Sequence, residues 1–260
     1  MSGFTEFHNH LLPAADDGAR SMDETVRHLQ AFARDGTTTL VFSPHLFGSL
    51  SRERGALDAR LEELRDIFEH VRQTLAGRDD VPALMLGHEV LLTDPAMARA
   101  VVGDRRVGHA GANVVLIEFG FQLPDACIPI IQAVSGCGRT PLIAHPERFR
   151  RDHSPVSLAE IRTWKSAGAL LQVNGGSVTG RYSPAVRTLA HRLLAEGLAD
   201  VIGSDNHADA RPQLPGEVWL DLADRDGTEQ AGLLLAENPA RLLRDEPTLP
   251  VPPLATAAVG

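Results

Sequence analysis

The feature that most constrains the fold is an alternation of short apolar runs with segments of helical character. About seven apolar runs are separated by stretches whose apolar residues recur at helical spacing. The runs span residues 4–8, 38–43, 83–86, 114–117, 141–144, 169–173 and 201–203. Helices are expected over 22–35, 55–76, 157–167 and 184–196. Such alternation is typical of βα units, so we predict an α/β protein built on a largely parallel sheet or barrel.

Length and composition are those of one globular domain. The chain has 260 residues, of which 43% are hydrophobic and 23% are charged, so it can bury a sizeable core. We find no internal repeat and no convincing linker. We therefore expect a single domain over residues 1–245 and a Pro-rich tail, disordered or loosely docked, over residues 246–260.

Charge and terminal sequence narrow the classes of function. The net charge of -9, without any Lys/Arg-rich block, argues against a nucleic-acid partner, which needs a basic face. One or two local arginines would still suffice for a small anionic substrate. The N-terminus lacks the basic and apolar regions of a signal peptide, and no apolar run reaches the roughly 18 residues of a membrane span. We expect a cytoplasmic protein with no membrane span.

Metal-binding side chains follow the apolar runs. All the runs except the sixth, which ends at Asn174, lead directly into a histidine or a carboxylate. These residues are His8, His10, His45, His88, Glu89, Glu118, His145, Asp205 and His207. The carboxyl ends of parallel barrel strands open onto one face, so these side chains should converge there. Imidazole and carboxylate groups are the usual ligands of zinc, manganese and iron, so the pattern predicts a metal cluster.

The remaining histidines have a simpler interpretation. Five of them fall in expected helices or loops, where surface positions are the rule, namely His28, His70, His109, His153 and His191. His88 lies next to Glu89, and we interpret it as a packing or supporting residue rather than a ligand.

Taken in order, the motifs resemble the polymerase-and-histidinol-phosphatase (PHP) family. The matching pieces are His8-Asn9-His10, Asp16-Asp17-Gly18, Ser43-Pro44-His45, Leu116-Ile117-Glu118-Phe119, Ile143 to Phe149, Gly168 to Asn174 and Ser204-Asp205-Asn206-His207. The resemblance runs from about Phe7 to Leu243. It is closer to the bacterial manganese-dependent tyrosine phosphatases of capsule and exopolysaccharide loci than to other PHP proteins.

This resemblance implies a distorted seven-stranded, TIM-like β/α barrel that holds two or three divalent ions. Manganese is the first choice, with iron or zinc as alternatives. The ligands implied by the motifs are His8, His10, Asp17, His45, Glu89, Glu118, His145, Asp205 and His207. Glu89 would bridge two ions. Arg148 and Arg211 match arginines near the family's phosphate site, and Glu6 stands where the family usually has an aspartate.

We accordingly expect a metal-dependent phosphomonoesterase in which hydroxide activated by the ions attacks phosphorus. Arg148 and Arg211 would neutralise charge on the phosphate oxygens. A phosphotyrosine protein, such as the tail of a bacterial tyrosine kinase, is the first-choice substrate. Histidinol phosphate or another small phosphomonoester is the alternative.

The sequence bears on four other classes of function. A cysteine-dependent tyrosine phosphatase is excluded, because neither Cys127 nor Cys137 follows a histidine or has an arginine six residues later. The segment from Asp224 to Thr228 matches a haloacid-dehalogenase motif, but too little chain follows it to build that fold. An amidohydrolase stays open, although the single Lys165 lies within an expected helix and not at a strand end. A domain that binds a metal or a phosphoprotein without turnover also stays open.

Overall fold

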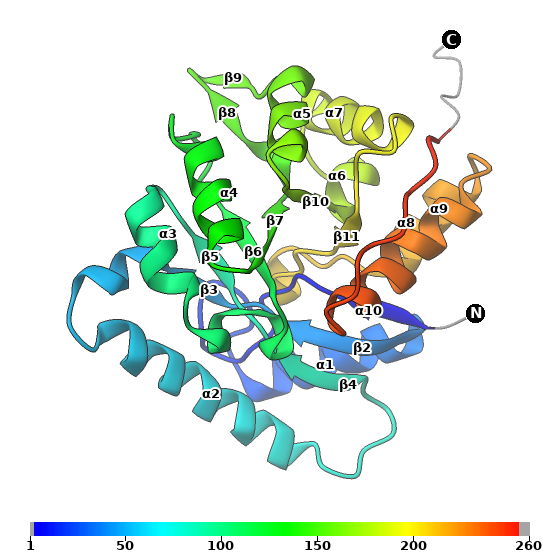
Figure 1. Ribbon diagram of the computed structural model, residues 1–260. Coiled ribbons are helices and arrows are strands. Elements are labelled where there is room, and N and C mark those ends of the chain that lie inside the picture. Colours follow the sequence, from blue (N-terminus) through cyan, green and yellow to red (C-terminus); the bar gives the residue numbers. More distant parts are fainter. Residues whose placement is uncertain (1–2, 255–260) are drawn as a thin grey trace.

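The computed structural model describes residues 3–254, in which strands and helices alternate along the chain (Figure 1). The strands are β1 (Phe4–Glu6), β2 (Thr37–Phe42), β3 (His45–Phe47), β4 (Ala83–Leu86), β5 (Glu89–Leu91), β6 (Val114–Glu118), β7 (Thr140–Ala144), β8 (Arg150–Arg151), β9 (Ser154–Pro155), β10 (Leu170–Asn174) and β11 (Val201–Gly203). Every pairing is parallel except that of the small β8–β9 hairpin. The predicted α/β class is thereby confirmed.

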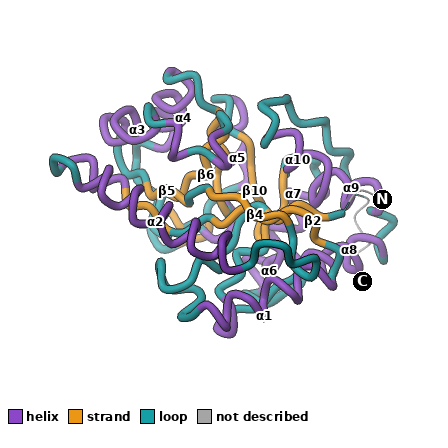
Figure 2. The backbone as a smooth tube through the Cα atoms, turned by 90° about the horizontal axis from the view of Figure 1, so that it is seen from below, coloured by secondary structure: helices purple, strands orange, loops and turns teal. Residues whose placement is uncertain are grey.

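The helices lie on the outside of the strands (Figures 1 and 2). They are α1 (Met22–Arg34), α2 (Ala56–Thr74), α3 (Pro95–Val102), α4 (Cys127–Gly136), α5 (Leu158–Ser166), α6 (Gly175–Val178), α7 (Pro184–Ala195), α8 (Pro215–Ala223), α9 (Thr228–Gly232) and α10 (Asn238–Leu242). The four helices expected from the sequence all form, with ends within about two residues of the predictions.

The start of α1 illustrates how local sequence sets these boundaries. The Ser21 hydroxyl accepts a hydrogen bond from the backbone N–H of Glu24 at 3.2 Å, and the Glu24 carboxylate accepts one from the N–H of Arg20 at 2.9 Å. The first bond satisfies an N–H group that the first helical turn leaves free, and the second ties the residue before the N-cap to the helix. After the helix, Gly36 adopts φ 99°, which lets the chain reverse into β2.

The strands form two parallel sheets instead of one continuous ladder. One sheet has the order β1-β2-β4, and the other has the order β11-β10-β7-β6-β5-β3. The second predicted strand is interrupted at Ser43-Pro44, where proline has no N–H to donate, and continues as β3. The third is interrupted at Gly87-His88 and continues as β5. The chain therefore passes from the first sheet to the second twice, between β2 and β3 and between β4 and β5.

A short contact joins the outer strands of the two sheets, β1 and β11, just beyond their carboxyl ends. Asn9 forms an isolated parallel bridge with Asn206. The N–H of Asp205 donates to the carbonyl of His8 at 2.7 Å, and the N–H of His10 donates to the carbonyl of Asn206 at 2.8 Å. These bonds bring the first and last metal-type motifs together.

The core is divided by the sheets. Alternate residues of β6 point to opposite sides, as strand geometry requires. Val115 and Ile117 join the large cluster under the helices, whereas Val114 and Leu116 pack with Phe7 in a separate cluster. Both faces of the strand are buried, so the strand ends are left as the exposed edge on which polar groups can gather.

The Pro-rich segment after residue 245 is docked as far as it is described. Val251 and Leu254 are buried, and the N–H of Leu249 donates to Asn238 Oδ1 at 2.7 Å. Residues 255–260, which belong to the predicted tail, lie outside the described part of the chain. Among residues 3–254, none of the helices combines the length and the apolar character that crossing a membrane requires.

Candidate metal centre

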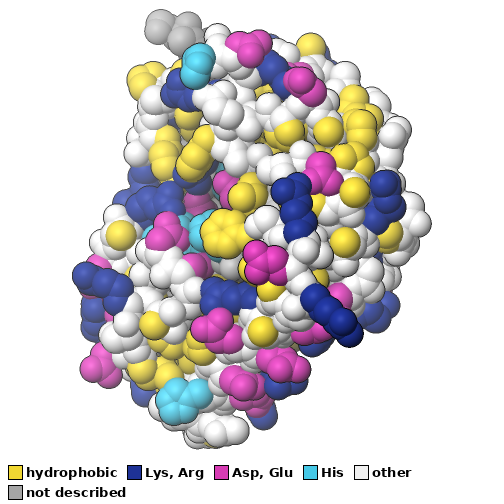
Figure 3. Space-filling view, turned by 90° about the vertical axis from the view of Figure 1, so that its left-hand side faces the viewer, with side chains coloured by type: hydrophobic (Ala, Val, Ile, Leu, Met, Phe, Trp, Pro, Cys, Tyr) yellow, Lys and Arg dark blue, Asp and Glu magenta, His cyan; other side chains and the backbone are white. Residues whose placement is uncertain are grey.

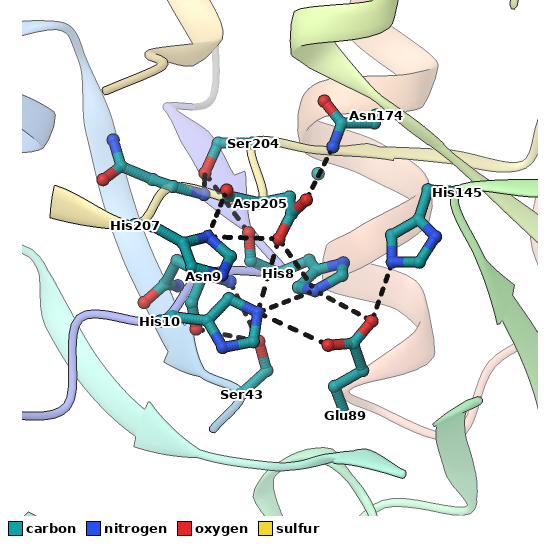
Figure 4. Close-up of polar contacts among 12 residues, drawn as sticks. His8, Asn9, His10, Ser43, Glu89, His145, Asn174, Ser204, Asp205 and His207 are labelled. Atoms are coloured by element: carbon teal, nitrogen blue, oxygen red, sulfur yellow. Dashed lines mark hydrogen bonds and ion pairs between the residues drawn. The ribbon is translucent and has the colours of Figure 1, made fainter. Parts of the chain in front are cut away.

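The nine predicted ligands lie close together, and His8, His10, Glu89, His145, Asp205 and His207 are labelled in Figure 4. Glu118 ends β6 and His145 follows β7, whereas His45 and Glu89 begin β3 and β5. The nine residues form four overlapping groups in which the donor atoms lie within 4.8 Å of one another. The groups are His10-Asp17-His45-His207, His8-Glu89-His145, His8-His10-Asp205 and His45-Glu89-Glu118. Several residues belong to two groups, which is the arrangement that ions sharing bridging ligands would need.

The separations between donor atoms match the edges of a coordination polyhedron. His8 Nε2 lies 3.3 Å from His10 Nε2, 3.4 Å from Glu89 Oε1 and 3.6 Å from Asp205 Oδ1. Glu89 also approaches His145 Nε2 at 2.9 Å and His45 Nδ1 at 3.0 Å. Metal–ligand bonds of ~2.1 Å place neighbouring donors roughly 3–3.5 Å apart. One carboxylate, Glu89, thus stands at the centre of the cluster.

Two of the histidines have their tautomers set by neighbours. His8 Nδ1 lies 2.8 Å from Gln172 Oε1, and His10 Nδ1 lies 2.7 Å from Asp16 Oδ2. When each Nδ1–H donates to these oxygens, both Nε2 atoms carry lone pairs that face each other. Beside the carboxylates of Glu89 and Asp205, these two Nε2 atoms attract positive charge, which a proton or a divalent ion can supply. The donor set therefore fits divalent metal ions.

The electrostatics of the cluster point the same way. Burial acts to raise the pKa values of the Glu89 and Asp205 carboxyls, but the surrounding histidines hold both well below the usual range. Burial acts to lower the pKa of His10, but Asp16, Asp205 and Glu89 raise it well above the usual value. Burial, reinforced by Glu89, raises the pKa of Glu118 to about 7. The carboxylates create a strongly negative, largely buried pocket that attracts positive charge.

Both predicted phosphate-binding arginines reach the cluster. Arg148 is largely buried and donates a hydrogen bond to Asp205, while Phe121 and Tyr182 lie 5.3 Å and 4.8 Å from its guanidinium carbon. Arg211 is more exposed and donates to His207 Nε2. Neither arginine is part of a distant surface ion pair.

Two ligand candidates have unusual backbone conformations. His145 adopts φ 32° and Asp205 adopts φ 50°, both in the left-handed region. Such conformations cost about 1–3 kcal/mol each and tend to cluster at functional sites. His145 directly follows β7 and Asp205 lies two residues after β11, and at each position the turn directs the side chain into the cluster.

Several supporting residues were not predicted. Gln172 orients His8, and the side-chain amide of Asn174 donates a hydrogen bond to Asp205 Oδ2 at 2.9 Å. Asp16, the neighbour of the predicted ligand Asp17, orients His10 and accepts the N–H of His45 at 3.0 Å. The signal for Gln172 was present, because it is a lone polar residue within the apolar run 169–173. For Asp16 no pattern distinguished the two adjacent aspartates.

Two further residues depart from simple expectations. His109 was expected at the surface, which is wrong: it is fully buried, stacks on the Phe7 ring at 4.5 Å and approaches the Phe7 carbonyl at 3.0 Å. Glu6 does not approach the donor atoms of the cluster. Its Oε1 accepts the N–H groups of His8 at 2.8 Å and Ser204 at 3.2 Å, and burial raises its pKa to about 7. It therefore ties β1 to the end of β11.

The cluster forms the floor of a cavity of about 430 Å³. On the face shown in Figure 3, hydrophobic side chains lie beside histidine side chains at a hollow in the surface. The lining includes Glu118, Arg148 and Arg211 together with two exposed aromatic residues, Phe47 and Phe121. The site is thus open to a ligand from solvent.

Residues 4–244 match the family model for capsular polysaccharide synthesis proteins, CpsB/CapC. The chain belongs to the CpsB/CapC family. It is 24% identical over 249 residues to the tyrosine-protein phosphatase YwqE of Bacillus subtilis, covering 95% of this chain and 94% of YwqE. It is 25% identical over 248 residues to the tyrosine-protein phosphatase CpsB of Streptococcus pneumoniae, covering 93% and 98%.

Solved structures agree with this membership at the level of the fold. A structure from a study of YwqE and CpsB, described as metal-dependent tyrosine phosphatases, superposes with a TM-score of 0.77 at 24% identity, covering 97% of this chain and 99% of that one. A lactonase from Listeria monocytogenes superposes with a TM-score of 0.52 at 15% identity, covering 93% and 94%. The lactonase therefore shares the overall fold of this chain.

Proposed function

We propose that this CpsB/CapC protein is a metal-dependent protein-tyrosine phosphatase of the capsule-synthesis type. The observation that carries the proposal is the convergence of nine histidine and carboxylate side chains with two arginines in one open cavity. The names of its relatives, tyrosine-protein phosphatases over nearly their whole length, supply the reaction. The substrate is a phosphotyrosine protein, such as a bacterial tyrosine kinase tail.

The nine residues His8, His10, Asp17, His45, Glu89, Glu118, His145, Asp205 and His207 hold two or three divalent ions in this proposal. Overlap of the four donor groups supports more than one ion, because His8, His10, His45 and Glu89 each belong to two groups. Manganese is the first choice, although donors of this type also accept iron or zinc. When bound, the ions supply positive charge to the phosphoryl oxygens and lower the pKa of water.

The protein's own groups position the phosphate. Arg148 is held between two aromatic rings, so its planar guanidinium can turn from Asp205 to the phosphate oxygens with little loss of entropy. Arg211 also lines the cavity and is more exposed, so its guanidinium can turn from His207 and Asp205 to a bound phosphate. A phenol leaving group, with a pKa of about 10, needs little protonation, so no general acid is required for tyrosine.

Particular contacts disfavour the rival reactions. Lys165 lies in α5 and bonds Asp200 at 2.6 Å, so it does not bridge the cluster as a carboxylated lysine does in many amidohydrolases. Cys127 donates to the Pro124 carbonyl, and burial raises the pKa of its thiol to about 11, so it is no thiolate nucleophile. Histidinol phosphate or another small phosphomonoester stays the second candidate, because the same cluster could act on it.

The remaining structural and cellular expectations belong to the same proposal. We take the seven runs of chain as one distorted barrel, supported by the Asn9–Asn206 bridge between its first and last strands. Residues 1–245 would form its single domain, followed by the Pro-rich segment. A cytoplasmic location and the lack of a nucleic-acid partner stay predictions from the sequence.

The test is a set of initial rates with added Mn²⁺ on a phosphotyrosine peptide and on histidinol phosphate, each with and without a chelator. We expect chelator-sensitive turnover and a higher kcat/KM for the peptide. A much higher kcat/KM for histidinol phosphate would assign the second candidate, and metal-independent turnover would overturn the role of the cluster.

A further inference from the structure

Phe47 and Phe121 are exposed on the edge of the metal-site cavity, and we call this pair the aromatic rim. Five large hydrophobic side chains are exposed in the described part of the chain, and the two aromatic ones both line this cavity. Their exposed fractions are 52% and 56%. Leaving so much phenyl surface in water is unfavourable, so two such rings beside one cavity indicate a ligand that covers them.

The backbone holds both rings in place. Phe47 ends β3, which pairs with β5 so that Phe47 lies opposite Leu91. The chain at Phe121 is fixed to the β8–β9 hairpin, because the carbonyl of Phe121 accepts the N–H of Arg150 at 2.8 Å. The rim is therefore not a pair of residues on a free loop tip.

Its place relative to the phosphate site is set by strand geometry. His45 and Phe47 lie two residues apart on β3, so their side chains share one face and are separated by roughly 6.6 Å along the strand. Their rings are stacked with centroids 6.2 Å apart. In the turn after β7, the Arg148 guanidinium carbon lies 5.3 Å from the centroid of the Phe121 ring. A group attached to a phosphate held by Arg148 and the cluster would emerge at the level of these two rings.

We propose that the aromatic rim is the specificity element that binds the phenyl ring of the substrate. This inference rests on the proposed function, since it assigns the ring of phosphotyrosine to Phe47 and Phe121. Offset or edge-to-face contact between aromatic rings adds about 0.5–1.5 kcal/mol to the gain from burying their surface. An alkyl phosphate makes neither contribution, so the rim favours aryl over alkyl phosphates.

The test measures binding without turnover. Phenylphosphonate and methylphosphonate both present a phosphonate to the cluster, and only the first carries a ring. Calorimetry on the Mn²⁺-loaded protein gives the ratio of their affinities. We expect the wild type to prefer phenylphosphonate, and Phe47→Ala and Phe121→Ala each to reduce that preference about three- to tenfold while leaving methylphosphonate binding unchanged.

The control is Leu220→Ala, which removes from α8 a 65% exposed hydrophobic side chain that does not line this cavity. It should leave the ratio of affinities unchanged. Retained methylphosphonate binding also shows that each phenylalanine variant is folded and holds its metal. Equal losses of both phosphonates, or an unchanged ratio, would overturn the assignment of the ring.

Parallel rates on a phosphotyrosine peptide separate this inference from the proposed function. If the wild type prefers phenylphosphonate but does not hydrolyse the peptide, the aromatic rim is supported as a ring site and the proposed phosphatase activity is overturned. Phenylalanine variants that lose peptide turnover at an unchanged phosphonate ratio refute the rim as a ring site, because Phe47 and Phe121 would then contact the peptide chain.

Discussion

At the scale of single residues, the site depends on side chains that do not themselves face an ion. Gln172 is fully buried within β10 and fixes the orientation of the His8 ring. Asp16 does the same for His10, and Asn174 holds Asp205. Such supporting groups limit the freedom of the ligands, so their loss weakens a metal site even though all its donor atoms remain.

The first prediction concerns Gln172→Leu, which keeps the size of the side chain but removes the acceptor for His8 Nδ1. We expect the Mn²⁺ affinity to fall about 10- to 100-fold, measured by calorimetry, with the helical circular dichroism unchanged. Gln73→Leu, on the exposed face of α2, is the matched control and should bind Mn²⁺ like the wild type. Wild-type affinity in Gln172→Leu would show that His8 needs no such support.

The second prediction concerns two of the donors themselves. His45→Ala and Asp205→Ala should each lower kcat on a phosphotyrosine peptide by at least about 100-fold. Each change removes a proposed ligand of the ions that would neutralise the charge of the reacting phosphate. Rates at saturating Mn²⁺ measure the effect, and circular dichroism checks that the variants fold. Unchanged turnover in either variant would remove that residue from the site.

At the scale of elements, the site depends on a close approach between β11 and the segment that follows β1. Gly203 closes β11, and a Cβ atom at this position would lie 2.7 Å from the Cβ of His8 and 3.0 Å from Gln172 Nε2. Only glycine allows the last strand to come this near to the first metal motif. The close approach of β11 to the segment after β1 thus depends on the absence of a side chain at Gly203.

The third prediction is that Gly203→Ala destabilises the protein by about 1–3 kcal/mol through overpacking and also weakens Mn²⁺ binding, because it displaces His8. Urea unfolding of the metal-free protein measures the first effect and calorimetry the second. Gly136→Ala is the control, since a Cβ in α4 would meet nothing within 4 Å. If Gly203→Ala unfolds with the same free energy as the wild type, β11 can move away from His8 without a loss of stability, which would contradict this account.

Elements and site differ in how far the sequence alone could predict them. The seven runs were predicted because apolar residues in short blocks are a local signal. The candidate ligands were predicted because they follow those blocks, except Asp17, which was implied by the family resemblance. The short strands β3 and β5 and the Asn9–Asn206 bridge were not predicted, since they depend on which strands become neighbours. His109 was misplaced for the same reason: its partner Phe7 is 102 residues away in the sequence.

At the scale of the whole molecule, His109 links stability to pH. Burial lowers its pKa from about 6.5 to about 3, so the unfolded chain binds a proton more tightly than the folded protein does. The contribution of His109 is therefore constant above pH 6.5, and stability is lost as the pH falls from there towards 3. The expected loss is about 1.4 kcal/mol per pH unit.

The fourth prediction follows from this linkage. Between pH 7 and pH 5 the wild type should lose on the order of 2 kcal/mol more stability than His109→Gln, in which no titrating group remains at this position. Urea unfolding at both pH values, with chelator present so that metal binding does not contribute, gives the comparison. The same pH dependence in both proteins would mean that the buried imidazole is protonated without cost.

The account as a whole depends on shared cations among the convergent side chains. Anomalous diffraction at the manganese absorption edge, from crystals grown with Mn²⁺, tests this most directly. We predict peaks about 2.0–2.3 Å from the donor atoms of His8, His10, Glu89 and Asp205. Density that shows these donors bonded only to one another and to water, with manganese absent or bound elsewhere on the molecule, would contradict the account.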